Sequence, residues 1–412
     1  MPYAARFAQT AVGRWLISRS RPDPATKPPF RIENEFFTVE VAQDGTLTLN
    51  DRRTGVVYPS LNQFVDGGDC GDEYNYSPPA SDQVVTARLK GARVDRGAVC
   101  QTIKVSLELQ IPAELSSDRK ARSGKTVTIP IISQVTLTSG VPRLDIQTEV
   151  DNGDRNNCGL DHRLRVHFPA PFTVTDANYD GHFEVVRRLL GVPASDETWA
   201  EQPRPEAPQR LFTDISDWIT GLLVANRGLP EVEVLKQSDG KAEIALTLLR
   251  CVGWLSRDDL STRKSHAGPF LATPQAQMIG KWTFDYSVIP HSGGDTILSY
   301  QQAYGFSAPL RAVSTPPHDG KLPAKGSFIQ VSPPEFILSA VKTAEDGQGW
   351  LVRGYNITAE EIPVTLQPWR RFPHAARITL AEQPLSTLAP AADGSVTFTA
   401  RGHEIVSVLF RE

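Results

Sequence analysis

"FFTVEVAQDGTLTLNDRRTGVVY" (residues 36–58) indicates the fold class most clearly, because its apolar residues recur at every second position. Phe37, Val39 and Val41 alternate with polar side chains. A period of two is that of a β-strand with one buried face. The Asp-Gly pair at 44–45 then supplies the residues that a tight hairpin turn favours. This stretch therefore predicts an antiparallel β-hairpin.

The same alternation of apolar and polar residues returns along most of the chain. Further strands are predicted for residues 127–137, 144–150, 164–169, 221–228, 242–250 and 281–291. Turn residues are abundant, with 30 glycines and 32 prolines. Apart from a few short pieces, only "HFEVVRRLLG" (182–191) reads as a helix. Alternating strands without intervening helices predict an all-β, antiparallel architecture.

A composition change divides the chain. "VSTPPHDGKLPAKG" (313–326) is rich in proline, glycine and lysine and has little periodicity. We expect a large β-supersandwich over residues 30–313, because stacked sheets bury many half-apolar strands. The series of short predicted strands within residues 326–412 indicates a small β-sandwich. Residues 1–29 predict a short amphipathic helix followed by a proline-rich linker.

Bulk composition excludes several classes of protein. The 412 residues are 40% hydrophobic and 22% charged, with a net charge of −4. Such a charge gives no electrostatic basis for binding nucleic acid or an anionic membrane. No apolar run approaches the ~20 residues of a membrane span, and Arg6 and Arg14 interrupt the apolar residues that a secretory leader needs.

Cysteine and histidine spacing argues against a metal site. Four cysteines lie far apart and form no CxxC pair, as expected in a reducing cytoplasm: Cys70, Cys100, Cys158 and Cys251. No HExxH motif occurs among the eight histidines. His162 and His167 are five residues apart, which places them on opposite faces of a strand. No nucleophile elbow or phosphate-binding loop is present either.

The acidic loop "DGGDCGDEYNYSPP" (66–79) is the first candidate site. Its acids do not follow the spacing of a calcium loop. Tyr74 and Tyr76 would share one face of an extended segment. Two such rings with acidic neighbours suit either the apolar face and hydroxyl edge of a sugar, or a buried tyrosine pair with a polar end.

A second acidic segment is "SRDDLSTR" (256–263). Asp258 and Asp259 are adjacent, so they do not form a pair of catalytic carboxyl groups. They suit a turn in which acids bind backbone N–H groups or the guanidinium groups of Arg257 and Arg263. A sugar-contacting loop is the alternative.

Several long motifs also resemble the β-domains of bacterial glycoside hydrolase family 38 α-mannosidases, in the family's order. They are "FRIENEFFTVEVAQDGTLTLNDRRTGVVY" (30–58), "FVDGGDCGDEYNYSPP" (64–79), "DHRLRVHFP" (161–169), "GLLVANRGLPEVEV" (221–234), "TLLRCVGWLSRDDLSTRKSHAGP" (247–269), "GDTILSYQQAY" (294–304) and "FILSAVKTAEDGQGWLVRGYN" (336–356). The resemblance covers approximately residues 30–412. It implies a galactose-mutarotase-like supersandwich followed by a small β-sandwich.

The resemblance also implies that the catalytic residues lie on a different domain. Enzymes of this family carry zinc and an aspartate nucleophile on an N-terminal α/β domain, and those motifs have no counterpart here. We therefore expect the C-terminal half of such an enzyme, without catalytic residues or a cofactor in this chain, and with zinc only in the missing domain. The positions that would contact substrate are Asp72, Tyr74, Tyr76, Asp258, Asp259 and Arg263.

Three hypotheses about function remain open. The chain supplies part of the substrate cleft to a separate catalytic α/β chain, and together they hydrolyse α-mannosides with retention. Alternatively, it is a stand-alone carbohydrate-binding or scaffold protein. The third hypothesis is an aldose-epimerase-like activity, which requires a histidine and a carboxylate that face each other in a sugar cleft.

Overall fold

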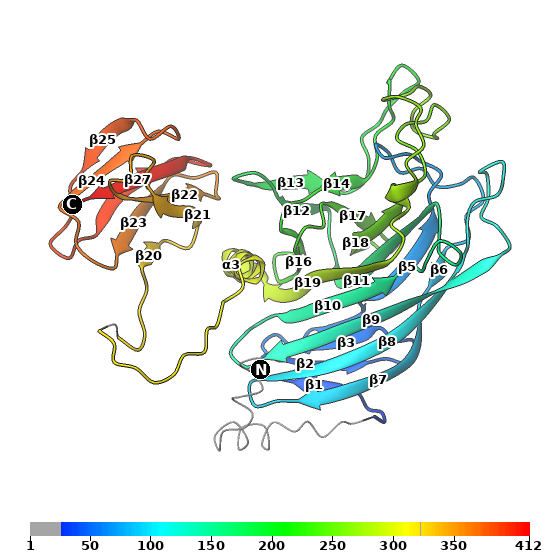
Figure 1. Cartoon of the computed structure of the whole chain (residues 1–412), viewed down its shortest axis with the longest axis horizontal. Helices are drawn as coiled ribbons and strands as arrows, with labels where there is room; N and C mark the ends of the chain where they lie inside the picture. The colour runs from blue at the N-terminus through cyan, green and yellow to red at the C-terminus, as the bar shows by residue number, and fades with distance from the viewer. Residues whose placement is uncertain (1–25, 322) are drawn as a thin grey trace. The chain divides into compact units, whose positions relative to one another are not determined.

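The computed structural model describes residues 26–321 and 323–412. The chain divides into two compact units (Figure 1). The larger unit takes the described chain up to Tyr179 and Arg188–Ser307; the smaller unit takes Asp180–Arg187 and Ala308–Glu412. The predicted N-terminal helix falls within residues 1–25, outside the described residues.

Three sheets are formed mainly by residues of the larger unit. One has four strands, in the order β1 (Arg31–Glu33), β2 (Phe37–Val41), β3 (Leu47–Asp51) and β4 (Val57–Leu61). The second has nine: β13 (Val185–Leu189), β12 (Asp176–Asp180), β15 (Phe212–Ser216), β16 (Thr220–Asn226), β19 (Lys281–Ser292), β10 (Leu144–Asp151), β9 (Thr126–Thr138), β8 (Cys100–Pro112) and β7 (Arg88–Arg96). The third has six: β14 (Glu206–Pro208), β17 (Glu231–Lys236), β18 (Lys241–Cys251), β11 (His162–Thr173), β5 (Gln63–Gly68) and β6 (Val85–Thr86).

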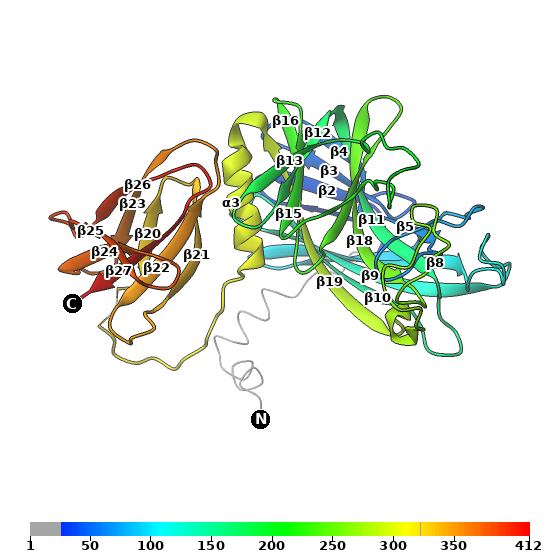
Figure 2. The ribbon, with the colours of Figure 1, turned by 90° about the horizontal axis from the view of Figure 1, so that it is seen from above.

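The three sheets share one hydrophobic core. Its cluster of buried residues includes Phe37 of β2, Ile131 of β9 and Phe168 of β11. Neighbouring strands run antiparallel, as in the pairs β8–β9 and β11–β18. In Figure 1, strands β7–β10 form one layer and β2 and β3 belong to a second layer, and Figure 2 shows β8–β10 and β2–β3 from above. The prediction of an all-β supersandwich is confirmed.

The hairpin predicted within residues 36–58 is present. β2 pairs antiparallel with β3, with Phe37 opposite Asp51 and Val41 opposite Leu47. At the turn, Gly45 has a φ of 92°, a left-handed conformation that glycine adopts without a Cβ clash.

The buried face of β9 includes a polar residue, Ser133. Ser133 lies between the buried positions Ile131 and Val135. Its hydroxyl lies 2.8 Å from that of Thr148, which lies 2.6 Å from the Tyr286 hydroxyl. These bonds satisfy polar groups that would otherwise cost free energy in the core.

The helix expected over residues 182–191 is wrong, because Val185–Leu189 forms strand β13. This edge strand is largely exposed, so no buried face imposes an alternating pattern on its sequence.

A helix that the sequence did not predict, α3 (Thr296–Ser307), packs on β16 and β19. Its buried side includes Ser299, and its exposed side includes Leu298, which is 54% exposed. Because polar and apolar residues do not separate cleanly, the sequence lacks a clear helical stripe. Two short 3-10 helices, η1 (Pro274–Gln277) and η2 (Gly293–Asp295), complete the larger unit.

The smaller unit is a β-sandwich. One sheet has the order β20 (Ile329–Ser332), β23 (Ile362–Pro368) and β26 (Val396–Ala400). The other has the order β21 (Phe336–Thr343), β22 (Trp350–Asn356), β27 (Ile405–Arg411), β24 (His374–Ile378) and β25 (Pro384–Leu388). Residues 308–321 and 323–328 contain no helix or strand.

Candidate functional site

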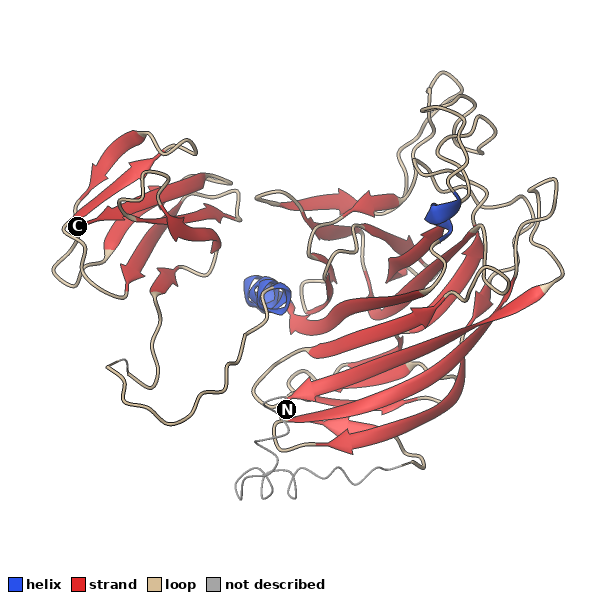
Figure 3. Ribbon diagram, viewed as in Figure 1, coloured by secondary structure: helices blue, strands red, loops and turns tan. Residues whose placement is uncertain are grey.

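The pairing of β5 and β18 with β11 brings two distant loops together. His162, the first residue of β11, is paired with Gly68 at the end of β5 and with Cys251 at the end of β18. Two loops follow these strands, here called the first loop (residues 69–80) and the second loop (residues 252–273). Both therefore leave the sheet at the same end of its strands. Figure 3 shows loops gathered beyond this end of the sheet.

Asp69 holds the first loop against strand β18. Its carboxylate accepts hydrogen bonds from the backbone N–H groups of Gly71 and Ser77, and from Nε of Arg250 at 2.8 Å. Burial raises the pKa of the Asp69 carboxyl group, and Arg250 opposes that shift. The pair thus fixes the loop on β18 rather than presenting an acid to solvent.

Asp72 joins the first loop to the second and is fully buried. One carboxylate oxygen accepts the N–H groups of Tyr74 and Asn75 at 3.0 and 2.9 Å. The other accepts the Arg257 N–H at 2.8 Å and the guanidinium of Arg263.

Arg263 is 5% exposed and also donates to the backbone oxygen of Ser265 and the side chain of Asn75. Asp72 and Arg263, both predicted to contact substrate, therefore bond mainly to each other and to these loops.

Tyr74 and Tyr76 lie in different surroundings, because the chain turns at Asp72 instead of remaining extended. Tyr74 is 54% exposed. A Cβ atom on Gly268 would lie 2.8 Å from the Tyr74 hydroxyl oxygen, so the glycine allows the ring to approach the second loop closely. The guanidinium carbon of Arg163 lies 3.4 Å from the centroid of the Tyr76 ring. Burial raises the pKa of the Tyr76 hydroxyl group.

The second loop places an aromatic pair and charged groups at its surface. The rings of Trp254 and Phe270 stack with centroids 4.4 Å apart and planes 4° apart. Arg257 donates two hydrogen bonds to Asp259, at 2.8 and 2.6 Å, and these bonds lower the pKa of that carboxyl group.

Asp258 is exposed, and its carboxylate lies 3.6 Å from Nε2 of His266. Of the two adjacent acids, Asp259 thus fits the ion-paired turn, while Asp258 faces solvent.

The exposed groups of the two loops combine aromatic rings with polar side chains. Tyr74 and Phe270 offer exposed aromatic rings, and the half-buried Trp254 stacks on Phe270. Asp258 and His266 offer polar groups that can meet hydroxyls. Within residues 26–321 and 323–412, no cluster of three or more His, Cys, Asp or Glu side chains could hold a metal ion. Among the described residues, every helix falls short of the length and hydrophobicity of a membrane span.

Sequence reasoning placed both loops in the site but missed several contributors. Trp254, Phe270 and His266 belong to the second loop, yet nothing in their spacing shows that they lie together or that Phe270 and His266 are exposed. Glu201 comes from a third segment, where its carboxylate accepts a hydrogen bond from the Asn75 side chain.

Comparison with known proteins identifies the family. Residues 32–260 match the glycosyl hydrolases family 38 C-terminal domain, and residues 335–408 match the family's C-terminal beta sandwich domain. The first match alone covers more than half of the chain, so this chain belongs to glycosyl hydrolase family 38 through its C-terminal domains.

Individual relatives agree with this. A protein of Halalkalibacterium halodurans named "Putative mannosylglycerate hydrolase" is 27% identical over 399 residues, covering 92% of this chain and 41% of the relative. The crystal structure of an alpha-mannosidase from Enterococcus faecalis V583 is 29% identical with a TM-score of 0.77, covering 94% of this chain and 43% of that one.

A second Enterococcus faecalis structure, of a protein in glycosyl hydrolase family 38, is 28% identical, also with a TM-score of 0.77. It covers 94% of this chain and 45% of the other. The chain thus spans less than half the length of the relatives it matches.

Proposed function

We propose that this chain forms one wall of an α-mannoside-binding cleft and that a separately supplied family 38 catalytic domain completes the cleft. The main support is the exposed ring of Tyr74 beside Gly268, in a loop that Asp72 and Arg263 join to the second loop. The names of the relatives, a mannosylglycerate hydrolase and an alpha-mannosidase, point to mannosides as substrates. The assembled enzyme would belong to mannose metabolism.

The proposed roles of the six predicted site residues differ. Tyr74 and Asp258 would touch sugar, because both are exposed on the two loops. Asp72 and Arg263 would position Tyr74 by holding the loop, while Asp259 holds Arg257. Tyr76 would brace the base of the first loop against Arg163. No residue of this chain is proposed to break a bond.

Zinc and the nucleophile would come from the partner, an α/β domain of the family's catalytic type. Orientation of the sugar by this wall would contribute to the rate, since a well-positioned substrate needs less reorganisation to reach its transition state. The four free thiols suit a reducing cytoplasm as the site of action.

Reconstitution tests the proposal. The chain would be mixed with a zinc-bearing α/β domain of family 38, taken from an adjacent reading frame if the genome encodes one there, and co-purification and hydrolysis of a nitrophenyl α-mannoside would be measured. We expect a stable complex that is active with zinc, whereas this chain alone is inactive. Zinc-stimulated hydrolysis by the pure chain alone would contradict the proposal.

The Tyr74→Ala variant tests the site itself. In the complex, we expect kcat/KM to fall by up to about a hundredfold without loss of assembly, as for other losses of substrate positioning. Tyr74→Phe keeps the ring and should retain most activity. Trp218→Ala, which removes an indole that is 89% exposed elsewhere in the larger unit, is the matched control.

The alternative is a stand-alone carbohydrate-binding or scaffold protein. It would be favoured if the genome encodes no catalytic partner and if the chain alone binds a mannoside saturably through Tyr74. A polarimetric assay of aldose mutarotation would test the epimerase hypothesis, for which Asp258 and His266 are the exposed carboxylate–histidine pair of the site.

A further inference from the structure

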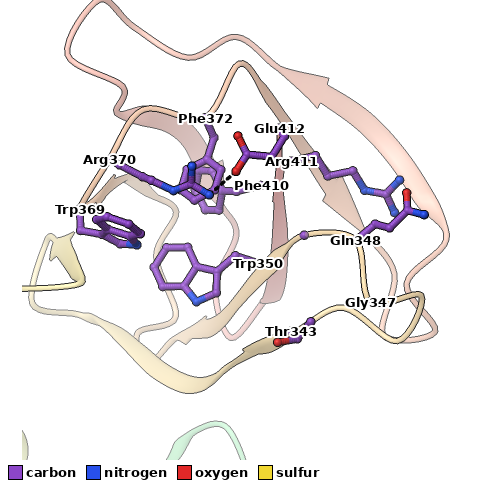
Figure 4. Close-up of a pocket in the computed structure, with 11 residues that line it drawn as sticks. Thr343, Gly347, Gln348, Trp350, Trp369, Arg370, Phe372, Phe410, Arg411 and Glu412 are labelled. Carbon is purple, nitrogen blue, oxygen red and sulfur yellow. Dashed lines mark hydrogen bonds and ion pairs between the residues drawn. The ribbon is translucent and has the colours of Figure 1, made fainter.

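The smaller unit contains a cavity at one end of its β-sandwich. The cavity has a volume of about 550 Å³ and is lined by the β21–β22 turn, the start of β22, the segment after β23 and the end of β27. This size lies in the range of small-molecule sites. We call it the tryptophan pocket, after Trp350 and Trp369 in its lining (Figure 4).

Aromatic rings form the base of the tryptophan pocket. Trp350 stacks on Phe372, with ring centroids 6.0 Å apart and planes 16° apart. The ring centroids of Trp350 and Phe410 are 5.8 Å apart. Phe372 and Phe410 are buried in the core of the sandwich. Trp369, by contrast, is 54% exposed. The core therefore fixes Trp350, and Trp369 adds an accessible indole beside it (Figure 4).

Polar groups surround these rings. Arg370 pairs with Glu412, and its guanidinium lies 4.4 Å from the ring centroid of Phe372. Arg411, at the other end of the pocket, pairs with Asp346, and Gln348 lies beside it (Figure 4). Guanidinium, amide and carboxylate groups together offer both donors and acceptors.

The charges indicate what kind of ligand fits. Each guanidinium of the pocket already faces a carboxylate, so the rim has no uncompensated cation to attract a phosphate or sulfate. A ligand with a flat apolar face and many neutral hydroxyl groups satisfies both the indoles and the rim.

We propose that the tryptophan pocket is a second carbohydrate-binding site, specific for neutral glycans. It is separate in sequence and structural unit from the loops that carry Tyr74. A glycan held here would tether a polymeric substrate to the protein and raise its effective concentration at the other site. This site does not depend on the function proposed for the larger unit.

Affinity electrophoresis of the full chain tests the proposal. Gels would contain α-mannan, galactomannan, β-glucan, xylan or, as the anionic comparison, heparin. We expect at least one neutral polysaccharide to retard the wild-type chain. Trp369→Ala should weaken that retardation by about tenfold or more in apparent Kd, as for truncation of an aromatic anchor. Because Trp369 is 54% exposed, we expect the variant to fold like wild type, and circular dichroism would check its folding.

Two matched variants make the outcomes distinct. Trp218→Ala removes an exposed indole of the larger unit and should leave retardation unchanged. Tyr74→Ala is measured alongside, because it separates retardation by the loops of the larger unit from retardation by the tryptophan pocket. Retardation by heparin alone, by no polysaccharide, or equally in wild type and Trp369→Ala would overturn the proposal. Loss of retardation in Tyr74→Ala but not in Trp369→Ala would overturn it too, while leaving the cleft proposed for the larger unit intact.

Discussion

The two candidate sites each combine exposed aromatic rings with an arginine–carboxylate pair, but the pairs differ in burial. Arg263 and Asp72 have side chains that are 5% and 0% exposed, whereas those of Arg370 and Glu412 are 41% and 75% exposed. A buried pair cannot lose one partner without leaving a desolvated charge, while an exposed pair can exchange its partner for water. The first pair therefore holds loops together, and the second remains available to a ligand.

Removing one partner of the buried pair should have the largest effect. We expect Arg263→Met to destabilise the larger unit by about 3–5 kcal/mol, because it leaves the Asp72 carboxylate buried without its counter-charge. Urea titration with hydrogen-exchange mass spectrometry would report the free energy of unfolding for peptides of each unit separately.

Asp259→Ala is the control for this experiment. It breaks an ion pair of the same loop whose carboxylate side chain is 52% exposed, so a loss below about 1 kcal/mol is expected. Equal losses in the two variants would mean that burial does not distinguish the pairs.

The pH dependence of stability should come next in size, and His291 of the larger unit provides the test. Burial opposes protonation of His291, but the Asp214 carboxylate, 2.8 Å from its Nε2, outweighs burial and raises the imidazole pKa. A histidine whose pKa is raised on folding adds stability below its unfolded pKa of about 6.5, and this contribution disappears as pH rises through the folded value.

The difference in unfolding free energy between wild type and His291→Gln should therefore be largest below about pH 6.5 and shrink over the range in which pH rises through the raised folded pKa. Hydrogen exchange of larger-unit peptides over that range would measure it, with peptides of the smaller unit as an internal reference. A difference that grows with pH would contradict the sign assigned to His291.

Breaking the exposed pair should have the smallest effect on stability. Arg370→Met should change the unfolding free energy of the smaller unit by less than about 1 kcal/mol, since both partners are hydrated. The same variant should lower the affinity for a neutral polysaccharide measurably, because a rim donor is lost. A large destabilisation would show that this pair is structural, as Arg263 and Asp72 are.

Sequence patterns predicted much of the fold because strand burial has a period of two. The hairpin over residues 37–51 and the buried face of β9 follow directly from that period. The prediction failed where the period was obscured: β13 has no buried face, and α3 buries Ser299 while exposing Leu298. In both places tertiary packing, rather than local pattern, decided the element.

Patterns and motifs in the sequence were enough to predict the all-β architecture, the family and the two loops that carry the candidate site. The surroundings of each side chain in these loops follow from the folded structure alone. Asp72 and Asp258 are both acids in polar loops, yet one is fully buried against Arg263 and the other faces solvent beside His266. The reason is that burial and charge pairing arise between segments some 190 residues apart, a relation that short-range sequence spacing does not encode.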